Sequence, residues 1–290
     1  MNAKDLVHDI QGLITLPDVY LRINQLVEDP ESSVSDIADV VSRDPSFTIR
    51  LLGIANSSLY HFSSKVDTVT RAVTIIGTAQ VRNLALSMSV SSSFEGMPND
   101  LVSMSNFWRH SLLCALVSRY LAVETRRCDR DVVFTGGLLH DIGELVIFNR
   151  CPAHAQEALL MVLDSGEEVT VPQAEREILG FDHADVGGEL ALSWNLPPVL
   201  TECIAHHHDI QAAKRHPREV ALVHIGNLVA QMAEIGTLDP DDVAPIDPRA
   251  WEITGLDESV IEPAIAAVTE EVAEVERLFF GGGAAGGKST

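Results

Sequence analysis

The chain has 290 residues, of which 46% are hydrophobic and 21% are charged, so it can bury a sizeable core and is not disordered. Its 42 acidic residues outnumber 20 basic ones, giving a formal net charge of -22 that argues against nucleic-acid and membrane partners. The four cysteines lack C-x-x-C pairing, and neither a signal-peptide pattern nor a run of about 18 apolar residues occurs. We therefore expect free thiols and a cytoplasmic location.

Apolar residues recur at helical spacing along the whole chain, whereas sustained strand-like alternation is missing. The clearest segments, in chain order, are residues 33–44, 78–94, 105–123 and 219–235. Helix starts are expected at Ser33 or Ser35, at Thr78 and at Asp182, whose side chains suit an N-cap. The pattern predicts an all-α fold.

A polar, proline-containing stretch near residue 100, MPNDLVSMS, indicates the main internal boundary and hence a two-lobed helical molecule. The predicted organisation is an extension over 1–13, an N-terminal helical lobe over 14–97, a second helical lobe with the C-terminal helix over 98–280, and a flexible tail over 281–290. The acidic helix of residues 262–280 can pack on its own domain or pair with another chain, and its short heptad pattern favours the former.

The glycine-rich tail formally matches the phosphate-binding P-loop pattern between Gly282 and Ser289. A P-loop needs a strand before it and a helix whose N-terminus receives the phosphates, but only Thr290 follows. We therefore expect no nucleotide site there.

The doublet His140-Asp141 lies inside an otherwise apolar run, GLLHDIGELVIF. Burying such a pair without partners costs several kcal/mol, so other polar groups must satisfy it. Further histidines occur in separate helical segments of the second lobe, and a helical bundle can direct such side chains inward to share a metal. The candidate ligands are His110, His140, Asp141, His183, His206 and His207, with His208 expected to face solvent.

Imidazole and carboxylate donors favour iron, manganese, nickel or zinc, as one or two ions, over calcium. The alternative is a cluster of hydrogen-bonded histidines without metal. Isolated histidines are interpreted as satisfied core residues: His8, His61, His154, His216 and His224.

The order H…HD…H…HH resembles the HDOD branch of the HD superfamily, with GLLHDIGELVIF around the doublet and FDHADVGGELALSWNLPPVLTECIAHHHD after it. The N-terminal half strengthens the likeness through LPDVYLRINQLVEDPESSVSDIADVVSRDPSFTIRLLGIANSSLY and VTRAVTIIGTAQVRNLALSMSV. The resemblance covers residues from about 14 to 235. It implies an all-helical bacterial signalling domain that is related to metal-dependent phosphohydrolases but generally non-enzymatic.

By motif position the six candidates correspond to the metal ligands of HD hydrolases, including the cyclic-di-GMP phosphodiesterases, but three departures argue against hydrolysis. The closing aspartate of the superfamily falls on Asn227, a poorer ligand. Glu144 replaces the lysine of HDIGK, as a solvated or salt-bridged residue or as an extra ligand. The residues after the histidine pair lack a GYP element.

The sequence therefore favours a non-catalytic regulatory protein with a structural or sensory metal site. The resemblance implies partners among sensor kinases, response regulators or cyclic-dinucleotide enzymes. A metal-dependent phosphohydrolase stays as the alternative, because six ligand-type residues are retained. Its phosphate clamp would have to come from Arg109, Lys214 or Arg215, which we interpret as surface charges.

Overall fold

The computed structural model describes residues 2–10, 16–94, 101–166 and 168–280, and within these ranges it is helical without strands. The predicted all-α class is confirmed. The described chain groups into two compact units, one formed by Met1–Ile14 with Gly96–Val268 and the other by Thr15–Glu95 with Thr269–Thr290. This grouping differs from the predicted lobes at both ends of the chain. The glycine-rich segment 282–289 and the Met97-Pro98 turn lie outside the described residues.

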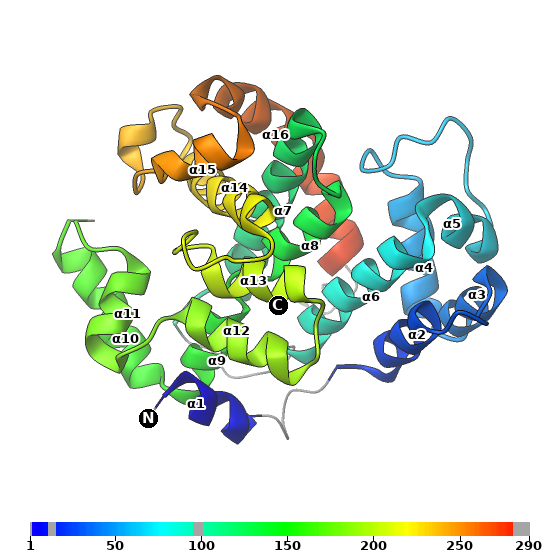
Figure 1. The fold of residues 1–290 in the computed structure, drawn as a ribbon, viewed down its shortest axis with the longest axis horizontal. Coiled ribbons are helices and arrows are strands. Elements are labelled where there is room, and N and C mark those ends of the chain that lie inside the picture. Colours follow the sequence, from blue (N-terminus) through cyan, green and yellow to red (C-terminus); the bar gives the residue numbers. More distant parts are fainter. Residues whose placement is uncertain (1, 11–15, 95–100, 167, 281–290) are drawn as a thin grey trace, which may run out of the picture. The chain divides into compact units, whose positions relative to one another are not determined.

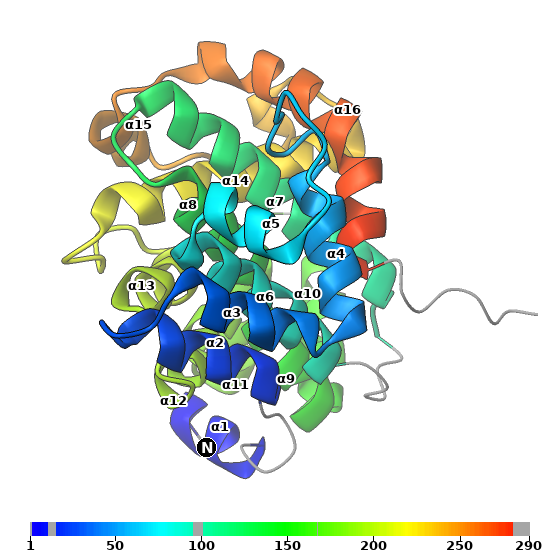
Figure 2. The ribbon, with the colours of Figure 1, turned by 90° about the vertical axis from the view of Figure 1, so that its right-hand side faces the viewer.

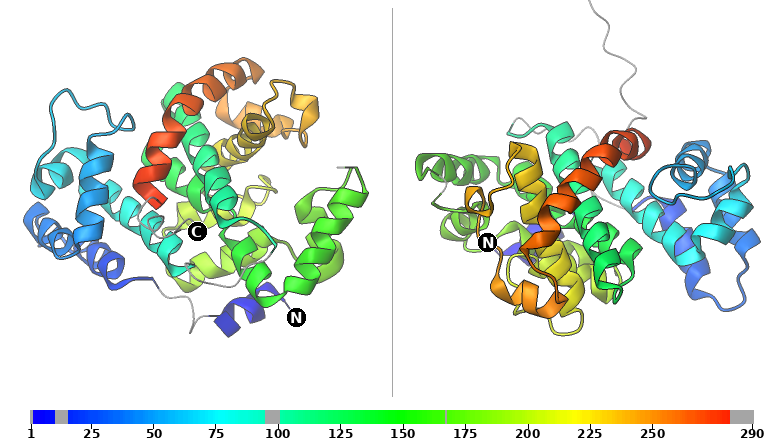
Figure 3. Two further views of the ribbon diagram at one scale, coloured as in Figure 1. Left: turned by 180° about the vertical axis from the view of Figure 1, so that it is seen from behind. Right: turned by 90° about the horizontal axis from the view of Figure 1, so that it is seen from above.

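The larger unit is built around three helices, α7, α8 and α14, which pack on one another in the middle of this unit (Figures 1 and 3). Helices α12 and α13 pair beside them, α10 and α11 form a hairpin, and α1 packs on α9 and α12. Its helices are α1 (Ala3–Ile10), α7 (Met104–Thr125), α8 (Arg130–Leu139), α9 (Ile142–Arg150), α10 (Pro152–Asp164), α11 (Val171–Leu179), α12 (His183–Ser193), α13 (Pro198–His206), α14 (Pro217–Ile235) and α15 (Pro248–Thr254), with two 3-10 turns at Pro240–Asp242 and Glu258–Val260.

The smaller unit, whose helix labels are clearest in Figure 2, carries five helices before the boundary and most of the last helix of the chain. These are α2 (Asp18–Glu28), α3 (Val34–Ser42), α4 (Pro45–Ala55), α5 (Val69–Ile76), α6 (Thr78–Ser93) and α16 (Ile261–Phe280), whose residues from Thr269 onward belong here. The end of α16 is fixed to α4 and the turn after it, because Arg50 donates to the carbonyl of Phe279 at 3.1 Å and the Ser58 hydroxyl donates to Glu274 at 2.7 Å. The acidic helix therefore packs on its own chain.

Two of the three predicted helix caps are confirmed, and the third residue, Thr78, is the first residue of α6 instead of its N-cap. Ser33, rather than Ser35, is the N-cap of α3 and forms a capping box with Asp36. Asp182 caps α12 through the backbone N–H of Asp185, and Pro198 opens α13 as its first residue. Each cap satisfies backbone donors that an isolated helix end leaves without partners.

The close approach of α9 to α12 depends on a glycine directly after the His-Asp doublet. A Cβ atom at Gly143 would lie 1.9 Å from the carbonyl oxygen of His183 and 2.6 Å from the backbone nitrogen of Gly187. No side chain can occupy that space without separating the two helices. Gly143 thus sets the distance between the helix that follows Asp141 and the helix that begins at His183.

Among the described residues, no helix combines the length and the hydropathy that crossing a lipid bilayer requires.

Gly143→Ala should lower the free energy of unfolding by about 2–3 kcal/mol, because the new methyl group meets backbone atoms that cannot yield. Urea unfolding followed by circular dichroism measures this loss. Gly53→Ala in α4 is the matched control, since its methyl group meets only the flexible end of Leu278. Equal losses in the two variants would show that the α9–α12 approach is not constrained as described.

A histidine and carboxylate cluster around Asp141

The His-Asp doublet lies at the junction of two helices, since α8 ends at Leu139 and α9 begins at Ile142. The break directs both side chains into the interior of the larger unit, where His140 is 0% and Asp141 7% exposed. Asp141 is the N-cap of α9, and its carbonyl accepts from the Glu144 N–H at 2.9 Å. The His-Asp doublet within this otherwise apolar run is therefore buried.

The carboxylate of Asp141 is shared among four imidazole rings. Its Oδ1 lies 3.4 Å from Nε2 of His183 and 3.4 Å from Nε2 of His207. Its Oδ2 lies 3.0 Å from Nε2 of His140 and 3.6 Å from Nε2 of His110. Side chains from α7, the α8–α9 junction, α12 and the end of α13 thus converge on one group.

The Nδ1 atoms of these rings are held by acceptors outside the centre. Nδ1 of His140 donates to the Gly137 carbonyl at 2.7 Å, and Nδ1 of His207 donates to the Ile204 carbonyl at 2.9 Å. A carbonyl can only accept, so the proton resides on Nδ1 and the Nε2 lone pair faces Asp141. Both Nε2 atoms are buried and lack a hydrogen-bond partner.

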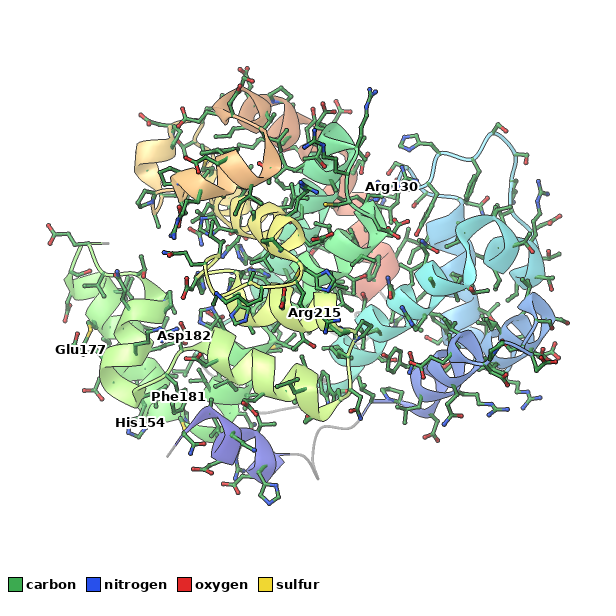
Figure 4. All side chains as sticks on the ribbon, viewed as in Figure 1. Arg130, His154, Glu177, Phe181, Asp182 and Arg215 are labelled. Atoms are coloured by element: carbon green, nitrogen blue, oxygen red, sulfur yellow. The ribbon has the colours of Figure 1, made fainter. Side chains whose placement is uncertain are left out.

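His183 has a carboxylate behind it. Its backbone N–H and its ring Nδ1 both donate to Oε2 of Glu175 on α11, at 2.9 and 2.7 Å. Glu175 is 2% exposed, and Oε1 of Glu144 lies 3.9 Å from the same Nδ1. Figure 4 labels Glu177 and Asp182, which mark α11 and the start of α12 near this contact. Glu175 therefore fixes both the position and the tautomer of His183.

His110 on α7 is engaged on both ring nitrogens by residues of α14. Nδ1 lies 2.9 Å from Oε2 of Glu234, and Nε2 lies 3.1 Å from Oδ1 of Asn227. The same Asn227 oxygen accepts from Nε2 of Gln231 at 3.3 Å. The residue at the position of the superfamily's closing aspartate is thus inside the cluster, as a hydrogen-bonding amide.

The structure changes the assignment of the histidine pair. His208 is not directed to solvent, because its Nε2 lies 2.8 Å from Nε2 of His183, and it belongs with Asp141, His183 and His207 to one group of donor atoms that all lie within 4.8 Å. His206 belongs to none of the metal-compatible groups found among the described residues. Helix α13 ends at His206, and the chain leaves the helix axis at the C-cap His207. The converging pair is therefore His207 and His208.

Of the alternatives for Glu144, the solvated one is wrong, because its side chain is 18% exposed, lies 3.9 Å from Nδ1 of His183 and forms a metal-compatible group with Glu175 and His183. Of the isolated histidines, His224 is a satisfied core residue as expected, bonded to the His207 carbonyl at 2.8 Å and to the Asp247 N–H at 3.0 Å. The same expectation is wrong for His8, His61 and His154, which are exposed.

Burial and neighbouring charges shift the protonation equilibria of the cluster. Burial lowers the pKa of His140, and burial together with the His207 and His183 rings holds the pKa of His208 well below its usual value. Burial and the charge of Asp141 raise the pKa of Glu144 to about 8. For Asp141 the surrounding imidazoles outweigh burial, so its pKa lies well below the ordinary range. Burial opposes charge on His110, but the hydrogen bond to Glu234 and the charge of Asp141 raise its pKa to about 9. The carboxylate of Asp141 therefore lies between rings that stay neutral, His140 and His208, and rings that favour a proton, His110 and His183.

The donor atoms fit a divalent transition ion. Tetrahedral coordination at a metal–nitrogen distance of about 2.0 Å places ligand atoms about 3.3 Å apart. In the four-residue group, His183 Nε2 lies 2.8 Å from His208 Nε2, Asp141 Oδ1 lies 3.4 Å from Nε2 of both His183 and His207, and all four donor atoms lie within 4.8 Å of one another. Two buried nitrogens without hydrogen-bond partners face the same carboxylate, an arrangement that a cation satisfies.

Sequence reasoning did not find Glu175 or Glu234, although each anchors a histidine of the cluster. One signal was present for Glu175, since it shares the buried face of an otherwise amphipathic helix with Ala174. Glu234 lies 124 residues from His110, and no local pattern connects them. The proposed clamp residues Lys214 and Arg215 are exposed, the latter labelled in Figure 4, and Lys214 donates to the Gln211 carbonyl.

Comparison with known proteins finds a curated relative of similar sequence. A protein of Treponema pallidum (strain Nichols), known only as an uncharacterized protein, is 24% identical over 238 residues, which are 80% of this chain and 45% of that protein. The chain thus spans about half the length of this curated relative.

Crystal structures show the same fold. A Geobacter sulfurreducens HDOD domain protein of unknown function has a TM-score of 0.76 at 26% identity, covering 96% of this chain and 98% of that one. A Shewanella amazonensis SB2B protein named "Putative phosphohydrolase" has a TM-score of 0.74 at 24% identity, covering 94% and 97%. Residues 13–210 match the HDOD domain, and the chain therefore belongs to the HDOD family, as its motifs predicted.

Proposed function

We propose that this chain is a regulatory protein of bacterial signal transduction that acts through protein–protein contacts and carries a divalent metal site with a structural or sensory role. The observation that carries the metal site is the pair of buried, unpartnered Nε2 atoms of His140 and His207 facing Asp141. Leaving such an atom unsatisfied costs about 1–3 kcal/mol, and a cation bound beside Asp141 would satisfy the one that it contacts.

The residues that would hold the ion are Asp141, His183, His207 and His208, with His110 and His140 on the other side of the carboxylate. A bound ion supplies positive charge and a cross-link between the α8–α9 junction, α12 and the end of α13. Zinc, iron, manganese and nickel all suit imidazole and carboxylate donors. His206 has no place in this set.

The surroundings of the centre support a non-catalytic role. Three carboxylates outside the ligand set touch or approach its histidines: Glu144, Glu175 and Glu234. A phosphoester entering the centre would meet these acidic groups, and phosphate hydrolysis depends on cationic groups that stabilise the transferred phosphate. With Asn227 in place of an aspartate, the centre lacks one carboxylate that could offset the charge of a second metal ion.

The alternative function is metal-dependent phosphohydrolysis. It is favoured by the nearly complete histidine and aspartate set and by the name of the Shewanella relative, which is similar in fold. Only a turnover assay on metal-loaded protein separates the two functions.

Partners of this chain are proposed by family resemblance to be signalling proteins, such as sensor kinases, response regulators or cyclic-dinucleotide enzymes. The short polar segment after α4 is held in a turn by Asn56. Its side chain donates to the carbonyl of Val66 and accepts from the N–H of Val66, both at 2.8 Å. We assign this segment a structural part in shaping the smaller unit rather than a chemical one.

Protein purified without chelator should contain a divalent metal and should not hydrolyse a generic phosphodiester, bis-p-nitrophenyl phosphate, or a set of nucleotides. A chelator should lower its melting temperature by roughly 5–10 °C, which corresponds to about 2.7 kcal/mol for an ion at a hundred times its Kd. Asp141→Asn should abolish both the metal and the chelator effect, whereas Asp164→Asn on the exposed end of α10 should keep them. Metal-dependent turnover that disappears in His140→Ala would establish the alternative function.

The metal-free centre is expected to store a proton on His183. Burial opposes charge on this ring, but the charge of Glu175 and the hydrogen bonds that the ring donates to Asp141 and Glu175 raise its pKa well above the usual value. A metal must displace that proton from Nε2, so metal binding at neutral pH should release protons. The ion pair with Glu175 then stabilises the metal-free fold mainly while His183 is charged.

In chelator-treated protein, Glu175→Gln should lower the free energy of unfolding by about 3 kcal/mol at a pH of about 6, below the ordinary histidine pKa of about 6.5. The loss should shrink as the pH rises through the raised pKa of His183, because the ring then becomes neutral in the folded state too. Urea unfolding across this pH range measures the effect. Glu177→Gln, exposed on the same helix, should show no comparable pH dependence, and a pH-independent loss in Glu175→Gln would refute the ion pair.

A further inference from the structure

The cluster around Asp141 divides into two subsites that use different oxygens of the same carboxylate. One subsite consists of Oδ1 with His183, His207 and His208, and the other consists of Oδ2 with His110 and His140. The first offers four donors, all of them side chains of ligand type. The second offers three, and the fourth position around it is taken by the amide of Asn227.

The two subsites also differ in how free their donor atoms are. In the first, Nε2 of His207 has no partner, and the 2.8 Å hydrogen bond between the Nε2 atoms of His183 and His208 joins two ligands of the same subsite. In the second, Nε2 of His140 is free, but His110 is bonded at both nitrogens, to Glu234 at 2.9 Å and to Asn227 at 3.1 Å. Coordination through His110 requires breaking the bond to Asn227.

Charge adds to this difference. A dipositive ion in the second subsite shares the single charge of Asp141 with any ion in the first, and the neutral amide of Asn227 supplies none. Two ions held 3–4 Å apart normally need several carboxylates to offset their repulsion. A single ion in the first subsite is therefore favoured over a pair of ions that share the charge of Asp141.

We propose that the centre is asymmetric: one ion binds tightly to Asp141, His183, His207 and His208, while Asn227 keeps His110 out of coordination and leaves the His110–His140 subsite weak. This inference rests on the metal site proposed above. It makes Asn227 the residue that sets the metal stoichiometry. His110 then serves as a hydrogen-bonded link between α7 and α14.

The test is the titration of chelator-treated full-length protein with Zn²⁺ by calorimetry, with metal analysis after dialysis. The wild type should retain one ion per chain, and a second should bind at least a hundredfold more weakly. Asn227→Asp keeps the size of the side chain and adds the missing carboxylate, so it should retain two ions. Asn195→Asp, exposed beyond the end of α12 and twelve residues after His183, adds the same charge away from the cluster and should retain one.

Two ligand variants locate the tight ion. His208→Gln should lose it, whereas His110→Gln should keep it, with circular dichroism confirming that both variants are folded. Titration with Co²⁺ gives a second readout, since the first equivalent should produce the intense visible absorption of a four-coordinate ion. Two equally tight ions in the wild type would overturn the asymmetry while leaving the metal proposal intact. A wild type that binds no ion would overturn the metal proposal itself, and the asymmetry with it.

Discussion

The larger unit depends on how one carboxylate is shared. Asp141 is buried where two helices meet, and its oxygens face four imidazoles that come from separate elements of the chain. Each ring is held from behind through Nδ1 by a backbone carbonyl or a glutamate, so the Nε2 atoms are directed toward the carboxylate before any ion arrives. Such preorganisation costs desolvation energy in the metal-free state, and a cation is the natural compensation.

Packing and chemistry are linked through the glycine that follows the doublet. Gly143 lets α9 touch the backbone of α12 at His183, and this contact brings Asp141 and His183 within 3.4 Å of each other. A larger residue at position 143 would push α9 away from α12 and so increase the distance between Asp141 and His183. The short motif HDIG is thus one structural device, in which two residues supply donor atoms and the glycine sets their distance from the next helix.

The sequence predicted the helices well because periodicity and capping are local properties, as Ser33 and Asp182 illustrate. It also predicted that the histidines of the second lobe converge on Asp141. It assigned His206 and His207, rather than His207 and His208, as the inward-facing pair, because the choice depends on where α13 ends. Glu175 and Glu234 escaped notice because an acidic residue on an amphipathic helix is usually solvated, and only the tertiary fold buries these beside His183 and His110.

Asn227 shows how such a centre can lose part of its chemistry without losing its fold. Removing any histidine of the cluster would leave buried acceptors or donors without partners, which costs about 1–3 kcal/mol for each group. An amide in place of a carboxylate keeps an oxygen that His110 and Gln231 both contact, at 3.1 and 3.3 Å, and removes only the charge. It is therefore a change that the packed interior tolerates, while the electrostatic support for a second ion disappears. Each histidine of the cluster is therefore costly to remove singly, whereas the charge at position 227 can be absent without loss of packing.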